Sequence, residues 1–248
     1  MNIGIRVPWR NLGKHLYAYR LLFDDAPVEV SFKDINEFEN EYIVDITSAL
    51  EDVFSNILSL RIPIDVSHDS ERNFELLEKA AYIASETLAE NVVVSTRRGD
   101  LKEAWLEKIH ELMSSYKLRL CFDLSQIPEC CEKDLFEALK EMPRGVFKIC
   151  YNIGKKALEG LSEEEILQDM ASILGLLQII YLSNVDENGL QVPPLSFNGR
   201  INMARLLEDI AEEIPSLCLI IDHSISPEQD YRELVRLREF ILSLTEKE

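Results

Sequence analysis

Three aspartates each follow a short apolar run and could bring carboxylate groups together. Asp65, Asp123 and Asp222 end runs whose composition is typical of buried strands. Carboxylates that share a small, partly desolvated space repel one another unless a cation or a proton relieves them. Oxygen-rich sites of this kind suit hard divalent ions such as Mg²⁺ or Mn²⁺. The three aspartates are therefore candidate metal ligands, and Asp123 and Asp222 are also candidate catalytic carboxylates.

Basic, amide and hydroxyl side chains also follow apolar runs, and they could bind a small ligand or its anionic group. The same cations suggest a different role for the three aspartates. Each carboxylate could cap the next helix or form an ordinary salt bridge with an arginine or a lysine. Metal binding, salt bridging and proton transfer therefore all stay open. The candidate substrate-binding residues are Arg97, Arg98, Asn152, Lys155, Tyr181 and Asn184.

Two of the four histidines lie where they could transfer protons. His68 and His223 come just after the third and eighth apolar runs, and an imidazole exchanges protons near neutral pH. We include both among the candidate catalytic residues, with an ordinary loop role as the alternative. His15 and His110 fall in helical stretches and are expected at the surface or in packing.

The elements that must position these residues repeat along the chain. Eight apolar runs start about 26 to 39 residues apart, the length of a strand, a helix and two loops. Such repeats without a Gly/Ser-rich linker predict a single α/β domain, residues 1–248, folded as one (β/α)8 TIM barrel. A doubly wound sheet is the alternative. The predicted strands are Asn2–Val7, Val28–Phe32, Leu60–Val66, Asn91–Ser95, Leu118–Leu124, Val146–Tyr151, Gln178–Leu182 and Leu217–Asp222.

Capping patterns predict where several helices begin. Asp100–Glu103, Ser162–Glu165 and Ser226–Gln229 each have the spacing of a capping box. Between the second and third strands, residues 35–42 and 45–58 could form one broken helix or two short ones, with the main helix in the second stretch. A further apolar helix face is expected from Phe74, Leu77, Ala81, Ala84 and Leu88.

Composition and charge exclude several classes of function. With 46% hydrophobic residues, the chain can bury a large core. Its 45 acidic and 26 basic residues give a net charge of −19, which argues against nucleic-acid binding. No run is long enough to span a membrane, and the first twenty residues lack an apolar signal core, so we expect a cytoplasmic protein. The excess of Glu over Gln is weakly typical of a thermophile.

The positions of glycine and cysteine in the sequence limit which cofactors the chain is expected to bind. No glycine-rich phosphate loop follows any predicted strand, so no nucleotide cofactor is expected. The absence of a Cys-x-x-Cys pair argues against a structural zinc site. Cys121, Cys150 and Cys218 lie inside apolar runs and are expected in the core, whereas the adjacent Cys130 and Cys131 could be free thiols in a reducing cytoplasm.

Three parts of the chain carry a family resemblance. The strongest similarity lies near the C-terminus, where a glycine-containing loop, a helix and an acidic final strand are expected in Pro193–Asn202, Met203–Leu207 and Leu217–Asp222. A fourth strand with its turn is expected in Val92–Gly99, and a sixth strand with its following helix in Ile149–Gly160. The chain in this way resembles the xylose isomerase-like superfamily of TIM barrels, which includes sugar phosphate isomerases and epimerases and the endonuclease IV group. The resemblance implies a divalent metal (Mg, Mn or Zn), held by His, Glu and Asp at strand ends, with sugar hydroxyls bound to it during proton or hydride shifts.

The chain departs from that family pattern at most ligand positions. Asp65 and Ser95 stand where histidines are usual, and Asp123 and Asp222 are one methylene shorter than the usual glutamates. Hydroxyl and ammonium groups are poor metal ligands compared with imidazole, so the metal-ligand set is degenerate. The Asp and His positions of the sixth and seventh strands hold Asn152, Lys155, Tyr181 and Asn184.

These departures leave two functions open. The first is a diverged isomerase or epimerase of a small sugar or sugar phosphate that uses the strand-end carboxylates. The alternative is a non-catalytic barrel that binds a small carbohydrate or an anionic metabolite after losing the family metal site, with Lys155 neutralising Asp123 or Asp222 in place of a metal. The endonuclease branch fits worst because the chain is strongly acidic. A homo-oligomer is open as well.

Overall fold

Eight parallel strands form a closed barrel in the computed structural model, which describes residues 2–23, 26–213, 217–222 and 226–245. The strand order around the barrel is β1-β10-β7-β6-β5-β4-β3-β2. This order confirms the predicted (β/α)8 barrel and excludes the doubly wound sheet. A separate antiparallel pair, β8 and β9, lies in the connection after β7.

The barrel strands lie where the apolar runs predicted them. Their ends differ from the predicted ends by at most three residues, and the largest difference is at the start of β3. The strands are β1 (Asn2–Pro8), β2 (Val28–Ser31), β3 (Ile57–Asp65), β4 (Asn91–Ser95), β5 (Arg119–Asp123), β6 (Phe147–Asn152), β7 (Leu177–Leu182), β8 (Asn184–Val185), β9 (Gln191–Val192) and β10 (Cys218–Ile221).

Helices connect the barrel strands. They are α1 (Trp9–Leu22), α2 (Ile35–Asn40), α3 (Ile43–Val53), α4 (Glu71–Glu86), α5 (Glu103–Ser115), a 3-10 turn (Leu124–Gln126), α6 (Glu129–Glu141), α7 (Ile153–Leu158), α8 (Glu163–Ser172), α9 (Met203–Glu213) and α10 (Pro227–Thr245). No helix within the described ranges combines the length and apolar character that a membrane span needs.

Two predicted helix boundaries are wrong and two are confirmed. Two helices, α2 and α3, follow β2, but α3 ends at Val53 because the chain becomes extended and enters β3 at Ile57. The expected capping box at Asp100 is absent, since α5 begins at Glu103 and its N-cap makes no side-chain bond. Ser162 and Glu165 form the predicted box of α8, and Ser226 Oγ accepts from Gln229 N–H at 3.4 Å.

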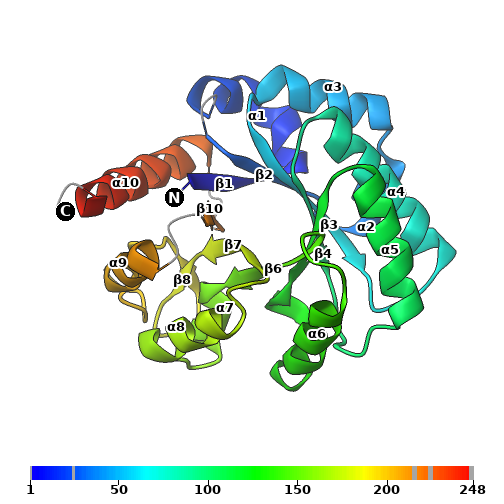
Figure 1. The fold of residues 1–248 in the computed structure, drawn as a ribbon. Coiled ribbons are helices and arrows are strands. Elements are labelled where there is room, and N and C mark those ends of the chain that lie inside the picture. Colours follow the sequence, from blue (N-terminus) through cyan, green and yellow to red (C-terminus); the bar gives the residue numbers. More distant parts are fainter. Residues whose placement is uncertain (1, 24–25, 214–216, 223–225, 246–248) are drawn as a thin grey trace. The chain divides into compact units, whose positions relative to one another are not determined.

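The residues fall into two compact units, residues 7–150 and residues 1–6 with 151–248; a single domain over 1–248 stays a prediction. In the first unit, α4 packs beside α3 and α5 and covers β3 and β4 (Figure 1). It buries Leu77, Ala81 and Ala84, as predicted. Leu88 was expected on the same face, but α4 ends before it, and Leu88 is 86% exposed with φ 57°.

The second unit contains β10, whose four residues are all buried between β1 and β7. Helix α9 packs against α8 and α10 (Figure 1) and buries Leu206, Leu207 and Ile210. The first candidate site lies at the carboxyl ends of β1, β10 and β7, which are neighbours in the barrel.

Candidate functional site

The first candidate site lies at the carboxyl ends of β1, β10 and β7. Gly4 pairs with Ile220, which pairs with Tyr181, and side chains two residues apart on a strand share a face. Arg6 and Asp222 therefore lie on the same face as Tyr181. The Arg6 guanidinium donates to Asp222 Oδ1, and its carbon lies 4.2 Å from the centroid of the Tyr181 ring.

Asn152, at the end of β6, completes this group. Its Nδ2 donates to Asp222 Oδ2 at 3.0 Å, and its Oδ1 accepts from the Lys155 N–H at 3.0 Å and so caps α7. The side chains of Arg6 and Asp222 are 14% and 17% exposed, whereas Tyr181 is fully buried. Arg6, Asn152, Tyr181 and Asp222, the Arg6 cluster, therefore hold hydrogen-bonding groups in fixed positions at the edge of solvent.

The segment after β7 also contacts the Arg6 cluster. Gln191 of β9 donates its side-chain amide to the backbone carbonyl of Asp222. Asn184 is fully buried, and its Nδ2 donates to the carbonyls of Ile201 at 2.8 Å and Pro194 at 3.3 Å. These bonds give Asn184 a structural role in holding the loop, and its contact with a substrate stays a prediction.

A second candidate cluster lies in the unit of residues 7–150, at the carboxyl end of β5. Asp123 is 1% exposed; it accepts from the Arg61 guanidinium of β3, from the Ser125 N–H at 2.9 Å and from the Ser125 hydroxyl. Ser95 of β4 lies in register between Asp65 and Asp123. The carboxylate of Asp123 is therefore neutralised inside the protein by a strand arginine. We call Arg61, Asp123 and Ser125 the Arg61 cluster.

The third aspartate makes a looser, more exposed contact. Asp65 accepts from the Ser67 N–H at 3.0 Å and forms an ion pair with Arg97 Nε at 3.7 Å, where the Arg97 side chain is 71% exposed. The predicted alternative of a salt bridge is present at this pair. His68 and Arg98 are exposed beside it, and His68 Nδ1 lies 3.3 Å from Ser67 Oγ. Catalysis by His68 and ligand binding by Arg97 and Arg98 stay predictions.

Two other predicted site residues are Lys155 and His223. Lys155 Nζ forms an ion pair with Glu159 at 3.2 Å, one turn further along the chain, and its side chain is 19% exposed. The second predicted catalytic histidine, His223, lies outside the described residues.

A divalent metal does not fit the residues that the structure describes. Asp65, Asp123 and Asp222 each have an arginine partner, whose positive charge would oppose a metal ion in the same place. Within the described ranges, no three His, Cys, Asp or Glu side chains come together as a metal-ligand set. The polar side chains at these strand ends are therefore better suited to hydrogen bonding with a ligand than to holding a metal ion.

Sequence reasoning missed the two arginines that pair with Asp123 and Asp222. Arg61 stands within an apolar run, and Arg6 lies near the end of the first predicted strand. A charged side chain inside a strand that is buried on both faces needs a partner, because an isolated buried charge is costly. That rule would have singled out Arg61, and also Glu29, which is fully buried and accepts from Ser59 Oγ at 2.9 Å.

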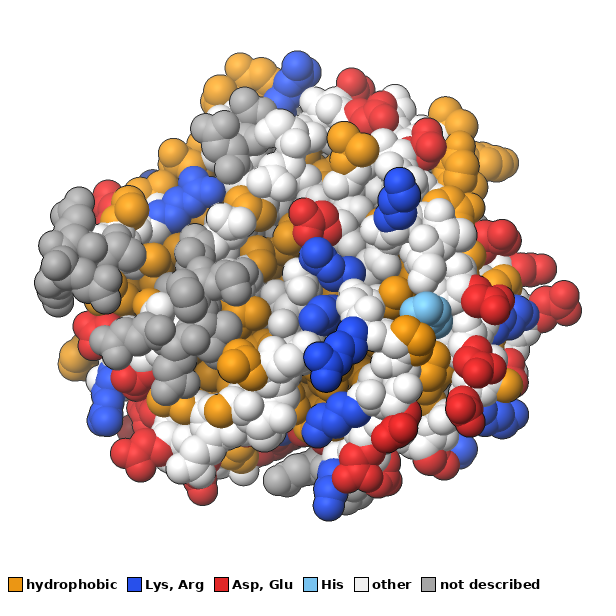
Figure 2. Space-filling view, viewed as in Figure 1, with side chains coloured by type: hydrophobic (Ala, Val, Ile, Leu, Met, Phe, Trp, Pro, Cys, Tyr) orange, Lys and Arg blue, Asp and Glu red, His pale blue; other side chains and the backbone are white. Residues whose placement is uncertain are grey.

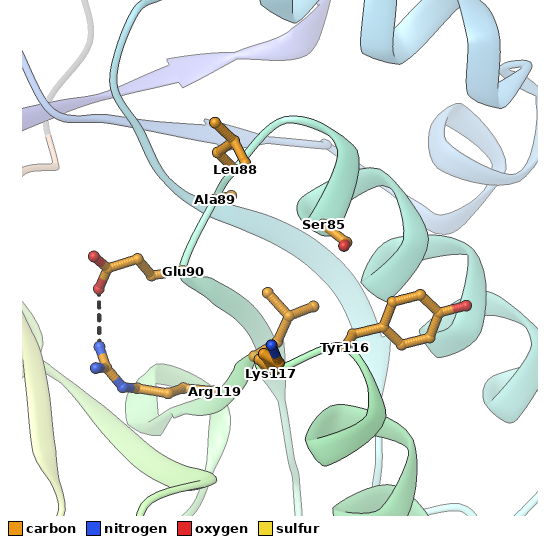
Figure 3. Close-up of a pocket in the computed structure, with 8 residues that line it drawn as sticks. Ser85, Leu88, Ala89, Glu90, Tyr116, Lys117 and Arg119 are labelled. Carbon is orange, nitrogen blue, oxygen red and sulfur yellow. Dashed lines mark hydrogen bonds and ion pairs between the residues drawn. The ribbon is translucent and has the colours of Figure 1, made fainter.

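A hollow of about 380 Å³ lies at the opposite, amino ends of β4 and β5 (Figure 3). Leu88 and Lys117, which follow α4 and α5, both have left-handed φ angles near this hollow. The ion pair of Glu90 and Arg119, at 2.9 Å, stands on one side of it. The amino ends of barrel strands serve stability rather than chemistry in this fold, so we assign the hollow no role in the site.

Comparisons with known proteins support the fold. No family model matches the chain, and no curated protein matches its sequence. Among solved structures, a xylose isomerase domain protein from Planctomyces limnophilus aligns with a TM-score of 0.71 at 14% identity, over 99% of this chain and 97% of that one. A D-psicose 3-epimerase has a TM-score of 0.68 at 11% identity, with 98% and 99% covered. An IolI protein with a bound zinc atom has a TM-score of 0.67 at 10% identity, with 98% of both chains covered.

These similarities confirm the predicted resemblance at the level of the fold. The chain has the fold of xylose isomerase-like barrels, whose solved members include isomerase-type and epimerase proteins. At these identities the side chains of the site have to be judged on their own chemistry.

Proposed function

We propose that the protein binds a small carbohydrate through the Arg6 cluster and that this binding needs no divalent metal. The observation that carries the proposal is the fixed position of Arg6. Its guanidinium is held by Asp222 and lies over the Tyr181 ring, at the carboxyl ends of the strands, where ligands bind in this fold.

The donors and acceptors of the Arg6 cluster suit neighbouring hydroxyl groups. A hydroxyl both donates and accepts, so a vicinal diol can donate to the Asp222 carboxylate and accept from the Arg6 guanidinium. The amide of Asn152 adds a further donor that is already oriented by its bond to Asp222. The pairing of Arg6 with Asp222 also makes the cluster neutral overall, which suits an uncharged polyol. The epimerase among the structural neighbours is named for a sugar, which supports this ligand class.

Isomerisation or epimerisation of that carbohydrate is the second candidate function. It is favoured by the position of Asp222, whose carboxylate is at the edge of solvent and could take a proton from a bound sugar. In this alternative, Asn152 and Arg6 position the carboxylate. Turnover of a sugar by the purified protein, lost in Asp222→Asn, would distinguish catalysis from binding alone.

Thermal shift tests the binding proposal directly. A ligand at about 100 times its Kd stabilises a folded chain by about 2.7 kcal/mol, which raises the Tm of a chain of this size by roughly 5–10 °C. We expect a monosaccharide or sugar phosphate to produce such a shift, equally with and without EDTA. We expect Arg6→Leu to abolish the shift.

Arg232→Leu is the matched control, because Arg232 is an exposed arginine of the same unit, on α10. A shift that survives Arg6→Leu, or one that disappears when EDTA is added, would contradict the proposal.

A further inference from the structure

Helix α1, which is kinked at His15, exposes basic side chains together with apolar ones. Arg10, Lys14 and Arg20 are exposed, and Tyr17 and Leu21 beside them are 77% and 68% exposed. Within the described part of the chain, none of the three cations has an ion-pair partner. We call these five residues the α1 face. Exposed apolar side chains rimmed by polar or charged ones are characteristic of a surface that contacts another protein.

The N-terminal residues 1–23, which include α1, have a net charge opposite in sign to that of the whole protein. Residues 1–23 contain four of the 26 basic residues and none of the 45 acidic residues, although the net charge is −19. An acidic protein surface is therefore the natural partner for the α1 face.

Helix α3 carries an exposed face with the complementary properties. Tyr42 and Val44, at the start of the helix, are 77% and 73% exposed, and Asp45, Glu51 and Asp52 are exposed acidic residues. The helix contains no basic residue. These five residues form the α3 face. In Figure 2, apolar side chains stand next to basic ones over α1 and next to acidic ones over the start of α3.

We propose that the α1 face docks on the α3 face of a second copy of this chain. Helices α1 and α3 pack against each other in one unit, so both faces are presented by the same compact part of the protein. A twofold axis then makes the same contact twice, α1 to α3 and α3 to α1, and closes the assembly as a dimer. Each contact joins unpaired cations to acidic side chains and covers four large apolar side chains, Tyr17 and Leu21 on one side and Tyr42 and Val44 on the other.

Charge reversal on either face tests the dimer. Lys14→Glu with Arg20→Glu makes the α1 face acidic, and Asp45→Lys with Glu51→Lys makes the α3 face basic. In sedimentation velocity, we expect the unchanged protein to be a dimer and each double variant to be a monomer. Dimerisation should weaken by at least about a hundredfold, because like charges would meet in both contacts.

Mixing the two double variants provides the decisive result. In an equimolar mixture, the acidic α1 face of one variant meets the basic α3 face of the other, and the basic α1 face meets the acidic α3 face. Both contacts are then restored, and a one-to-one heterodimer should form. The four substitutions combined in one chain should likewise restore a homodimer, which checks that the variants have not lost association through misfolding.

Lys140→Glu with Arg144→Glu is the matched control for the reversal on α1. It makes the same change in net charge as Lys14→Glu with Arg20→Glu, at two exposed residues elsewhere in the unit. This variant should remain a dimer. Three results would overturn the proposal. One is a protein that is monomeric at all concentrations, which would mean that the α1 face does not contact a second copy of this chain. The others are a dimer that survives both reversals and a mixture that stays monomeric.

Discussion

The guanidinium carbon of Arg6 lies 4.2 Å from the centroid of the Tyr181 ring, while the same guanidinium donates to Asp222. The ring is fully buried, so it forms a fixed apolar surface under a side chain that would otherwise sample many rotamers. The attraction between a guanidinium and an aromatic face adds to this restraint. Arg6 is thus held in place before any ligand arrives.

Replacing the Tyr181 ring should weaken ligand binding through Arg6. Tyr181→Leu removes the aromatic face, whose interaction with a partly desolvated cation contributes about 1–2 kcal/mol, so the Kd should rise roughly tenfold. Tyr181→Phe keeps the ring and should change the Kd by less than about threefold. Isothermal titration of both variants with the same carbohydrate checks this. Equal Kd values for the two variants would show that the ring does not position Arg6.

Removing Arg61 should destabilise the protein much more than removing an exposed arginine. Arg61→Met leaves the Asp123 carboxylate, 1% exposed, without its guanidinium, which should lower the free energy of unfolding by about 3–5 kcal/mol. Arg119→Met breaks an ion pair whose side chains are 40% and 63% exposed, and it should cost less than about 1 kcal/mol. Urea unfolding of both variants measures the difference. Similar losses in the two variants would contradict the assignment of Arg61 as a buried partner.

The sequence was sufficient to predict the barrel but not the pairing of charges at the strand ends. Apolar runs with helical segments between them are local signals, and they identified every barrel strand to within three residues. Arg6 and Asp222 are 216 positions apart in the chain and meet only because β1 and β10 are neighbours in the closed barrel. Local patterns cannot show which cation such a carboxylate meets, so salt bridging, metal binding and proton transfer all stayed open for it.

The boundaries that were mispredicted have a similar cause. Leu88 has the right spacing for the buried face of α4, but the helix had already ended, and the left-handed turn at Leu88 directs its side chain to solvent. Periodicity indicates which face of a helix is apolar, whereas the end of the helix depends on how the chain must turn to enter the next strand. The Ser162 box was predictable because both of its partners lie within one helical turn.

The capping box of α8 should make stability depend on pH. Bonds from the Ser162 N–H and hydroxyl lower the pKa of the Glu165 carboxyl below its ordinary value. A carboxyl with a lowered folded-state pKa stabilises the protein at neutral pH, and this contribution is lost as the pH falls through the folded-state pKa. Glu165→Gln should therefore be less stable than the unchanged protein at neutral pH, and the difference should shrink in acid.

Glu164→Gln is the control for this pH dependence, because Glu164 lies in the same first turn of α8 without the capping bonds. Urea unfolding over a series of pH values gives both curves. If the two variants lose the same stability at every pH, the capping bonds are not the cause.

The buried thiols should resist alkylation in the folded protein. Cys121 and Cys150 are fully buried, as predicted, and burial raises the pKa of the Cys150 thiol well above its ordinary value, with the neighbouring Cys121 thiol adding to the effect. Because the thiolate is the reactive form, Cys150 should stay unlabelled by iodoacetamide even when the pH is raised through the range in which an ordinary thiol ionises. Cys131 is only partly buried and should be labelled before Cys121 and Cys150. Peptide mass spectrometry after labelling in buffer and in urea checks the order. Labelling of Cys150 as fast as Cys131 in buffer would mean that the strand pair β5 and β6 opens far more readily than its buried side chains imply.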